Sequence, residues 1–182
     1  MTQSAADLMQ NSATRTDPAS DTMIREITTT IMALPSIRQH RLSNTAFSTR
    51  EFVLVRVRLE NGIEGIGEAA VLGGPRWAEE SVESIKAVID RYLSPVLIGC
   101  PATNWTDTAT KMKRAAFRNN AAKGAVETAI LDALTRTHDV PLVNLFGGAS
   151  RDRVPVLWAL ASGDVDQEIA EAQDKLARRE HK

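Results

Sequence analysis

The chain has 182 residues, of which 43% are hydrophobic and 25% charged, and 22 Lys and Arg against 23 Asp and Glu give a net charge of −1. This composition is that of a globular protein and excludes a wholly disordered chain. The near-zero charge argues against a broad electrostatic surface for nucleic acid or for an anionic membrane. No apolar run reaches the roughly 18 residues of a membrane span. Cys100 is the only cysteine and cannot form an internal disulfide, which fits a cytoplasmic location.

Residues 1–23 are expected to form a disordered leader. They are rich in Ser, Thr, Ala and Asp and contain no apolar segment of the kind found in secretory signals. Order is predicted to begin near Ile24, where a stretch rich in Thr and Ile indicates a strand that ends at Pro35. The polar residues 36–50 are interpreted as a loop.

A β-hairpin is the strongest local prediction. Residues 52–59 alternate, with Val53, Val55, Val57 and Leu59 on one face. Asn61 and Gly62 tolerate positive φ and predict a two-residue turn. Residues 63–70 then form the return strand, so an antiparallel meander opens the domain.

Helices are expected next. After a turn-rich loop at 71–77, a helix from about Ala78 carries an apolar stripe made of Val82, Ile85, Ile89 and Tyr92. Asn104 is expected to cap a second helix, with Trp105, Ala109, Met112 and Ala116 on one face. A third helix opens at Asn119 or Asn120 and presents many alanines, which predicts close packing, and residues 141–146 form a short helical turn.

The pattern changes after Arg151. Residues 154–160 are almost wholly apolar, which is typical of a strand buried on both faces in a parallel sheet. Residues 164–179 form an amphipathic helix, and no second parallel strand follows it. A parallel strand needs neighbours. We therefore expect a complete α+β domain at 24–150, followed at 151–182 by the opening of an unfinished β/α domain.

Five motifs carry a family resemblance. They are LPSIRQHRL at 34–42, GIGEA at 65–69, LGGPRWAEES at 72–81, LFGG at 145–148 and WALASGD at 158–164. In this order they resemble the N-terminal half of the muconate and chloromuconate cycloisomerases of the enolase superfamily. The resemblance implies an α+β capping domain, a meander plus a three-helix bundle, followed by the first βα unit of an incomplete TIM-type barrel.

The resemblance also implies an activity that this chain does not carry by itself. Family members use Mn²⁺ or Mg²⁺ and a Lys-x-Lys on the second barrel strand to form a lactone from a muconate in aromatic catabolism, and they are homo-oligomers. This chain contains neither the catalytic lysines nor the metal-binding carboxylates. We therefore expect no catalytic and no metal-ligating residue here, and an inactive fragment.

What the resemblance does assign is a substrate lid made of two loops. It includes Arg38, His40, Leu72, Gly73, Gly74 and Trp77. The residue types agree with this role: the two glycines let the backbone approach a ligand, Trp77 offers a flat apolar surface, and the cations favour a dicarboxylate. The plainer alternatives are that Trp77 packs at a helix start and that Arg38 and His40 are ordinary loop residues.

Two other functions remain open. The chain is alternatively a non-catalytic binding or assembly module, with the apolar residues 154–160 and the helix after them as its contact surface. It is otherwise a fragment of another enolase-superfamily enzyme, such as a dipeptide epimerase.

Overall fold

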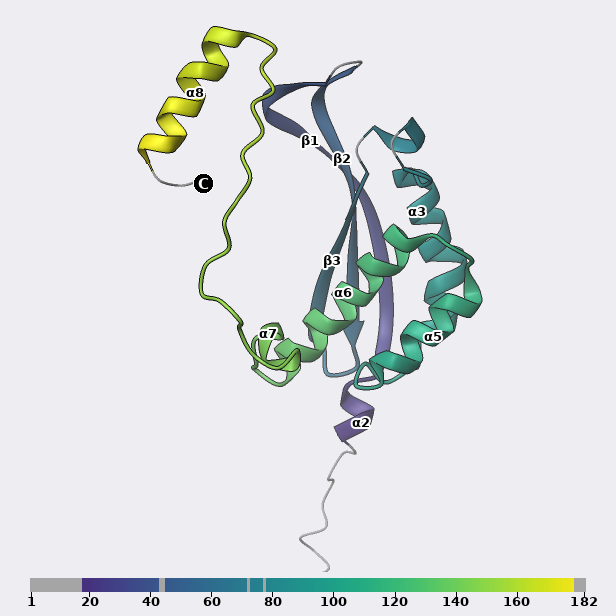
Figure 1. Cartoon of the computed structure of the whole chain (residues 1–182). Helices are drawn as coiled ribbons and strands as arrows, with labels where there is room; N and C mark the ends of the chain where they lie inside the picture. The colour runs from purple at the N-terminus through teal and green to yellow at the C-terminus, as the bar shows by residue number, and fades with distance from the viewer. Residues whose placement is uncertain (1–17, 43–44, 72, 77, 179–182) are drawn as a thin grey trace, which may run out of the picture.

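The computed structural model describes residues 18–42, 45–71, 73–76 and 78–178. Figure 1 shows a three-stranded antiparallel sheet, in the order β1-β2-β3, with a layer of helices over one face. The strands are β1 (Ile24–Leu42), β2 (Thr45–Leu59) and β3 (Glu64–Ala70). The predicted meander is confirmed, and the strand order follows the chain.

Order begins before Ile24. Residues 18–23, expected in the leader, form the short helix α2 (Pro18–Asp21) and an isolated bridge between Met23 and Pro101. Thr22 is buried, and its carbonyl accepts a bond from the Ala102 amide at 2.9 Å. Residues 1–17 lie outside the described part of the chain.

The loop predicted at 36–50 is wrong, because β1 and β2 continue as a long two-stranded ribbon. Leu34 pairs with Arg50, and pairing resumes from His40 opposite Phe47 to Leu42 opposite Thr45. The register shifts between Pro35 and His40. Pro35 has no N–H to donate, so an irregularity beside it is expected. The residues of this ribbon are mostly polar, so the sequence shows no hydrophobic alternation here that would predict a strand.

The predicted hairpin between β2 and β3 is confirmed, but its turn has three residues rather than two. Leu59 N donates to the Ile63 carbonyl at 2.9 Å, which leaves residues 60–62 as the loop. Gly62 has φ of +84°. Three-residue hairpin loops commonly end with a glycine in the left-handed region, as this one does.

The core lies between the sheet and the helices. The face of β2 predicted to be apolar is fully buried, and α6 (Asn120–Thr137) covers it with its alanine-rich side. The buried members of this core include Val53, Val55, Val57, Leu59, Ala125, Val126, Ala129, Ile130 and Ala133. The third predicted helix and its close packing are confirmed.

One continuous helical segment follows the loop after β3, and it is made of three parts. They are α3 (Val82–Val88), the π-helical turn η2 (Ile89–Leu93) and α4 (Ser94–Leu97). Leu93, which lies in the π turn four residues after Ile89, is fully buried, whereas Tyr92, which was predicted on the apolar stripe, is 55% exposed. The helix also starts at Val82 rather than near Ala78, because Ser81 forms a capping box with Ser84.

The remaining helices follow the predictions more closely. Asn104 caps α5 (Trp105–Ala115) by accepting a bond from Asp107 N. The short α7 (Leu142–Leu145) follows α6 where a helical turn was expected. Asp164 caps α8 (Val165–Ala177) through Gln167 N at 3.0 Å.

The strand expected at 154–160 is not formed. Residues 147–164 contain no helix and no strand, and they run beside the sheet toward the end of the β1–β2 ribbon, where α8 lies (Figure 1). Val154 is 73% exposed and Leu157 is 89% exposed. Within 154–160, only Val156 makes a bridge. A parallel strand forms only along a neighbour that supplies the other half of its ladder.

Candidate functional site

Two hollows meet where the β1–β2 ribbon leaves the helical layer. The first has a volume of about 350 Å³ and is lined by Thr49, Arg50, Glu51, Val71, Gly73, Gly74, Pro75, Ser81, Val82 and Glu83. It is bounded on one side by β2 and on the other by the chain between β3 and α3. We call residues 71–80 the 71–80 loop. The glycines at its start take φ of +70° and +62°, which favours glycine at both positions.

The second hollow is a more apolar groove of about 520 Å³. It is lined by Leu34, Pro35, Ser36, Ile37, Arg50, Phe52, Leu157, Trp158 and Ala159. Its walls therefore come from the β1–β2 ribbon and from the extended segment before α8. No hydrogen-bond partner is found among the described residues for the buried hydroxyl oxygen of Ser36. Apolar walls with a few polar groups are typical of small-molecule sites.

Arg50 belongs to both hollows. It lies on β2 opposite Leu34, and it is the one basic residue in either set of described lining residues. Glu51 and Glu83 are the acidic residues of the first hollow. Arginine donates two parallel hydrogen bonds to a carboxylate. The arrangement therefore places one guanidinium beside an apolar groove.

Two side chains of α8 hold Trp158 in place. Its indole Nε1 donates to Glu171 Oε1 at 3.0 Å, and Lys175 Nζ lies 4.2 Å from the ring centre. Both partners lie one turn apart on the same side of the helix. The pair fixes the orientation of the Trp158 ring at the rim of the groove.

Glu83 carries a carboxylate that resists protonation. Its pKa is lowered, first because the Ser81 side chain donates a hydrogen bond to it and then because its own backbone amide does. Glu83 lies in the first turn of α3, where the helix dipole also favours an anion. The first hollow, which Arg50 also lines, therefore keeps a negative charge at neutral pH.

The structure brings some of the predicted lid residues to this place. Gly73 and Gly74 line the first hollow. Arg38 and His40 belong to β1, beyond the groove residue Ile37, but their side chains lie outside the described part. Leu72 and Trp77 also fall outside it.

Sequence reasoning missed Arg50, Phe52 and Leu34 as site residues. The sequence obscures these residues because the polar stretch 36–50 favours a loop. Once β1 and β2 are extended through this stretch, the pairing of Leu34 with Arg50 follows directly, and Ile37 is placed at the same end of the ribbon.

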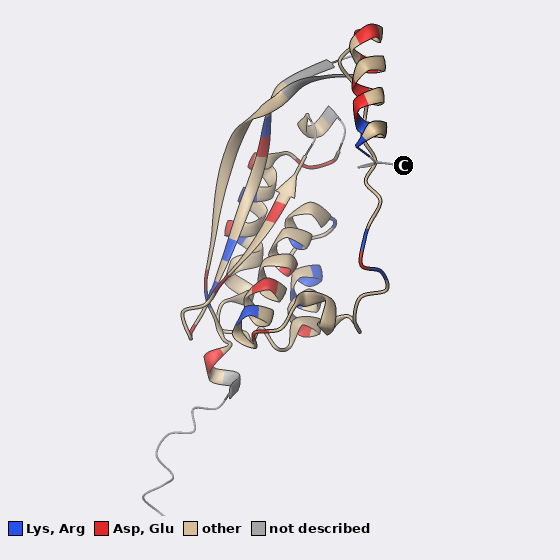
Figure 2. Ribbon diagram, turned by 90° about the vertical axis from the view of Figure 1, so that its left-hand side faces the viewer, with Lys and Arg blue, Asp and Glu red and all other residues tan. Residues whose placement is uncertain are grey.

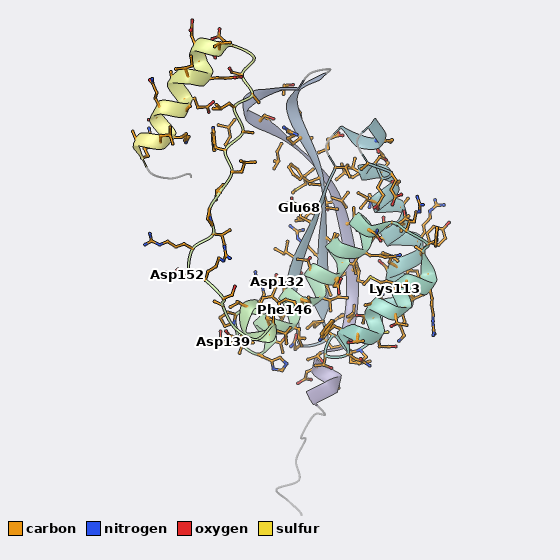
Figure 3. The ribbon with its side chains drawn as sticks, in the orientation of Figure 1. Glu68, Lys113, Asp132, Asp139, Phe146 and Asp152 are labelled. Atoms are coloured by element: carbon orange, nitrogen blue, oxygen red, sulfur yellow. The ribbon has the colours of Figure 1, made fainter. Side chains whose placement is uncertain are left out.

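The rest of the described chain adds little site chemistry. Acidic and basic residues are interspersed over strands and helices (Figure 2). Glu68 lies on β3 and Asp132 on α6 (Figure 3), and Asp132 Oδ2 accepts the outward-facing amide of Ile66 at 2.8 Å. Among the described residues, no group of three or more His, Cys, Asp or Glu could hold a metal ion. No described helix has the length and apolarity needed to cross a bilayer.

Comparison with known proteins identifies the family. Residues 24–147 match the N-terminal domain described as mandelate racemase / muconate lactonizing enzyme. The chain belongs to this family. The match covers the sheet, the helical layer and the 71–80 loop, and it ends at Gly147, just before the extended segment.

Curated members of the family are similar over most of this chain. Muconate cycloisomerase 1 of Acinetobacter baylyi is 41% identical over 160 residues, which are 87% of this chain and 43% of that protein. Muconate cycloisomerase 1 of Pseudomonas putida is 45% identical over 82% of this chain and 40% of its own length. A chloromuconate cycloisomerase of Pseudomonas putida is 39% identical over 87% of this chain.

Solved structures agree. The muconate lactonizing enzyme of Pseudomonas fluorescens in complex with muconolactone superposes with a TM-score of 0.85 at 41% identity, over 88% of this chain and 43% of that chain. The 2-chloromuconate cycloisomerase of Rhodococcus opacus gives a TM-score of 0.81 at 44% identity. The chain therefore spans less than half the length of the family members that it matches. The expected resemblance to the N-terminal half of a cycloisomerase is confirmed.

Proposed function

We propose that this chain is the capping part of a muconate or chloromuconate cycloisomerase and that it supplies the wall that closes over a dicarboxylate substrate. The observation that carries the proposal is the position of Arg50. This cation lies between the 71–80 loop and the apolar groove, in a domain 41% identical to a lactonizing enzyme in complex with muconolactone.

The chemistry of the two hollows suits a muconate. Such a substrate is a short conjugated chain with a carboxylate at each end. The groove provides apolar contacts from Leu34, Ile37 and Phe52, and Arg50 provides a partner for one carboxylate. Closing the 71–80 loop over it would exclude water and strengthen the electrostatic interactions inside.

The reaction itself depends on groups beyond these residues. The family resemblance implies Mn²⁺ or Mg²⁺, but the described residues contain no set of donors that fits a metal ion. No step of lactone formation is therefore assigned to this chain. Its role is to bind and orient the substrate and to exclude water, and it is inactive on its own.

Residues 151–182 are proposed to be the first βα unit of the barrel. Trp158 and Leu157 already face the groove, and α8 has formed with its cap in place. Further barrel strands would cover the exposed apolar side chains of 154–160 and of α8, in which Ile169 is 52% exposed. The family resemblance implies a homo-oligomer, and we propose that the complete enzyme is one.

The test is a fusion protein. Residues 1–182 are joined to the part of Pseudomonas putida muconate cycloisomerase 1 that follows the 40% matched by this chain. The fusion should convert cis,cis-muconate in the presence of Mn²⁺. Arg50→Gln should raise KM by roughly 10- to 100-fold, since a hydrogen bond to a charged group contributes about 1.5–3 kcal/mol, while kcat changes little.

Arg56→Gln is the matched control. Arg56 lies on the same strand and is exposed, but it lines a separate hollow with Glu26, Thr28, Arg58 and Glu64. Its replacement should leave KM unchanged. Equal effects of the two substitutions, or an active fusion indifferent to Arg50, would contradict the proposed role of this wall.

The second function left open is a binding or assembly module. The observation that favours it is the exposed apolar surface of 154–160 and α8. A stable, monodisperse oligomer of the isolated chain would support this alternative over the capping part of an enzyme.

A further inference from the structure

The 71–80 loop ends at a buried carboxylate. Glu80 is 5% exposed, and its two oxygens accept hydrogen bonds from the backbone of α6. Oε1 accepts from Ala121 N at 2.8 Å and Oε2 from Ala122 N at 3.2 Å. A buried charge is tolerated only when it is paired and hydrogen-bonded. Position 80 is therefore fixed against the start of α6, although Ala121 lies 41 positions further along the chain.

The first amides of α6 need this partner because the N-cap residue, Asn119, does not accept a hydrogen bond from them. Asn119 takes a left-handed conformation with φ of +54° and makes no side-chain cap bond. Its Nδ2 instead donates to the Phe117 carbonyl at 2.7 Å. The first amides of a helix have no partner within the helix and carry the positive end of its dipole. An anion from elsewhere in the chain satisfies both conditions, and Glu80 provides it.

The neighbouring Glu79 has a different character. Its Oε2 lies 3.1 Å from Arg118 Nη1, but the two side chains are 48% and 68% exposed. Exposed ion pairs of this kind contribute little to stability. Glu80 rather than Glu79 is therefore the group that holds the loop.

We infer that Glu80 is a positioning residue for the substrate-closing loop: it fixes the loop's C-terminal end on α6, so that Gly73, Gly74 and Pro75 close the first hollow against a fixed end. The inference rests on the proposed function of the 71–80 loop. At the other end of the loop, Val71 follows β3 directly and packs against the hydrophobic core, and Ser81 caps α3 immediately after Glu80. Gly73, Gly74 and Pro75 thus form the movable wall of the first hollow between two fixed ends.

Native-state proteolysis of the 182-residue chain tests this directly. Trypsin cleaves after Arg76, inside the loop, and mass spectrometry follows the fragment that ends there. Glu80→Gln keeps the shape of the side chain but removes its charge and one acceptor. It should speed cleavage after Arg76 at least fivefold. Glu79→Gln, the adjacent exposed carboxylate, should leave the rate unchanged.

A second control distinguishes local loosening of the loop from a general loss of stability. Ile130→Val weakens the core of α6 far from the loop and should lower the urea midpoint without speeding cleavage after Arg76. If Glu80→Gln does not fold, Glu80→Asp replaces it, because the charge stays but the shorter side chain does not reach both amides. That variant should also be cleaved faster than the wild type.

Cleavage of the Glu80 variant at the wild-type rate would overturn the inference. So would equal acceleration by Glu79→Gln or Ile130→Val. The experiment contains no substrate, so its outcome is independent of the fusion assay. If the fusion is inactive but Glu80→Gln speeds cleavage as expected, only the proposed function is contradicted. If the fusion behaves as expected but Glu80→Gln is cleaved at the wild-type rate, only the role of Glu80 is contradicted.

Discussion

Gly67 of β3 lies directly against the backbone of Ala125 in α6. A Cβ atom built on Gly67 would overlap the Ala125 carbonyl oxygen and lie 3.0 Å from Ala129 N. Gly65 has the same relation to Ala129 and Ala133 one helical turn further on. The two glycines remove side chains where strand and helix cross, so that the alanine face of α6 reaches the sheet.

Gly67→Ala should therefore destabilise the protein strongly. Overpacking a core costs about 1–3 kcal/mol and more where the obstacle is backbone, so we expect a loss of at least about 3 kcal/mol in the free energy of unfolding by urea denaturation. The control is Gly124→Ala in α6, whose Cβ would meet nothing within 4 Å. It should stabilise by about 0.5–1 kcal/mol, because alanine favours helix. Similar effects of the two substitutions would show that β3 and α6 do not approach so closely.

The π-helical turn between α3 and α4 makes a second prediction. Leu93→Ala should cost about 2–5 kcal/mol, since Leu93 is fully buried. Tyr92→Ala should cost far less, because Tyr92 is 55% exposed. An uninterrupted α-helix would continue the stripe of Val82, Ile85 and Ile89 to Tyr92. A larger loss at Tyr92 than at Leu93 in urea unfolding would contradict the burial of Leu93 in the π turn.

Glu83 gives a pH dependence with a defined sign. Its pKa in the folded protein is lowered, chiefly by the Ser81 side chain. The stabilisation is then complete above the pKa of an unfolded glutamate, about 4.3, and it disappears as the pH falls through the folded value. The difference in unfolding free energy between wild type and Glu83→Gln should therefore be constant near pH 7 and shrink as the pH falls below about 5.

The Ser81 contribution is measurable separately. In Ser81→Ala, the carboxyl carbon of Glu83 followed by NMR should titrate at a higher pH than in the wild type, because the main donor to the carboxylate has been removed. An unchanged titration would assign the shift to another group.

The extended segment before α8 predicts self-association of the isolated chain. Leu157 is 89% exposed and Val154 is 73% exposed. Exposed apolar segments of this kind promote aggregation. Light scattering should rise with protein concentration, and Leu157→Asp with Val154→Asp should reduce it. A monodisperse monomer at all concentrations would show that this surface does not drive association.

The sequence predicts the packed part of this fold better than its edges. Alternation in β2 and the alanines of α6 report directly on burial, so the hairpin and the helix were predictable. The ribbon at 36–49 has polar residues on strands that leave the core, and the pairing of Leu34 with Arg50 depends on the partner strand rather than on local pattern. The π turn was not visible either, because one inserted residue changes the buried face without changing composition.

In the candidate site, too, some residues can be predicted from local sequence and others cannot. Gly73 and Gly74 were predictable, because positive φ at a loop is a property of glycine itself. Arg50 was not, because its place in the site requires the register of β1 and β2. Glu80 was not either: its partners Ala121 and Ala122 lie more than 40 residues away, and only the folded chain brings them together.

The most direct test of the central claim uses the isolated 182-residue chain with cis,cis-muconate and Mn²⁺, followed by the ultraviolet absorbance of the substrate. A capping part that binds and encloses substrate without the catalytic groups predicts no loss of absorbance above the uncatalysed rate. A loss that EDTA abolishes would contradict the account, because it would place a working metal centre within these residues.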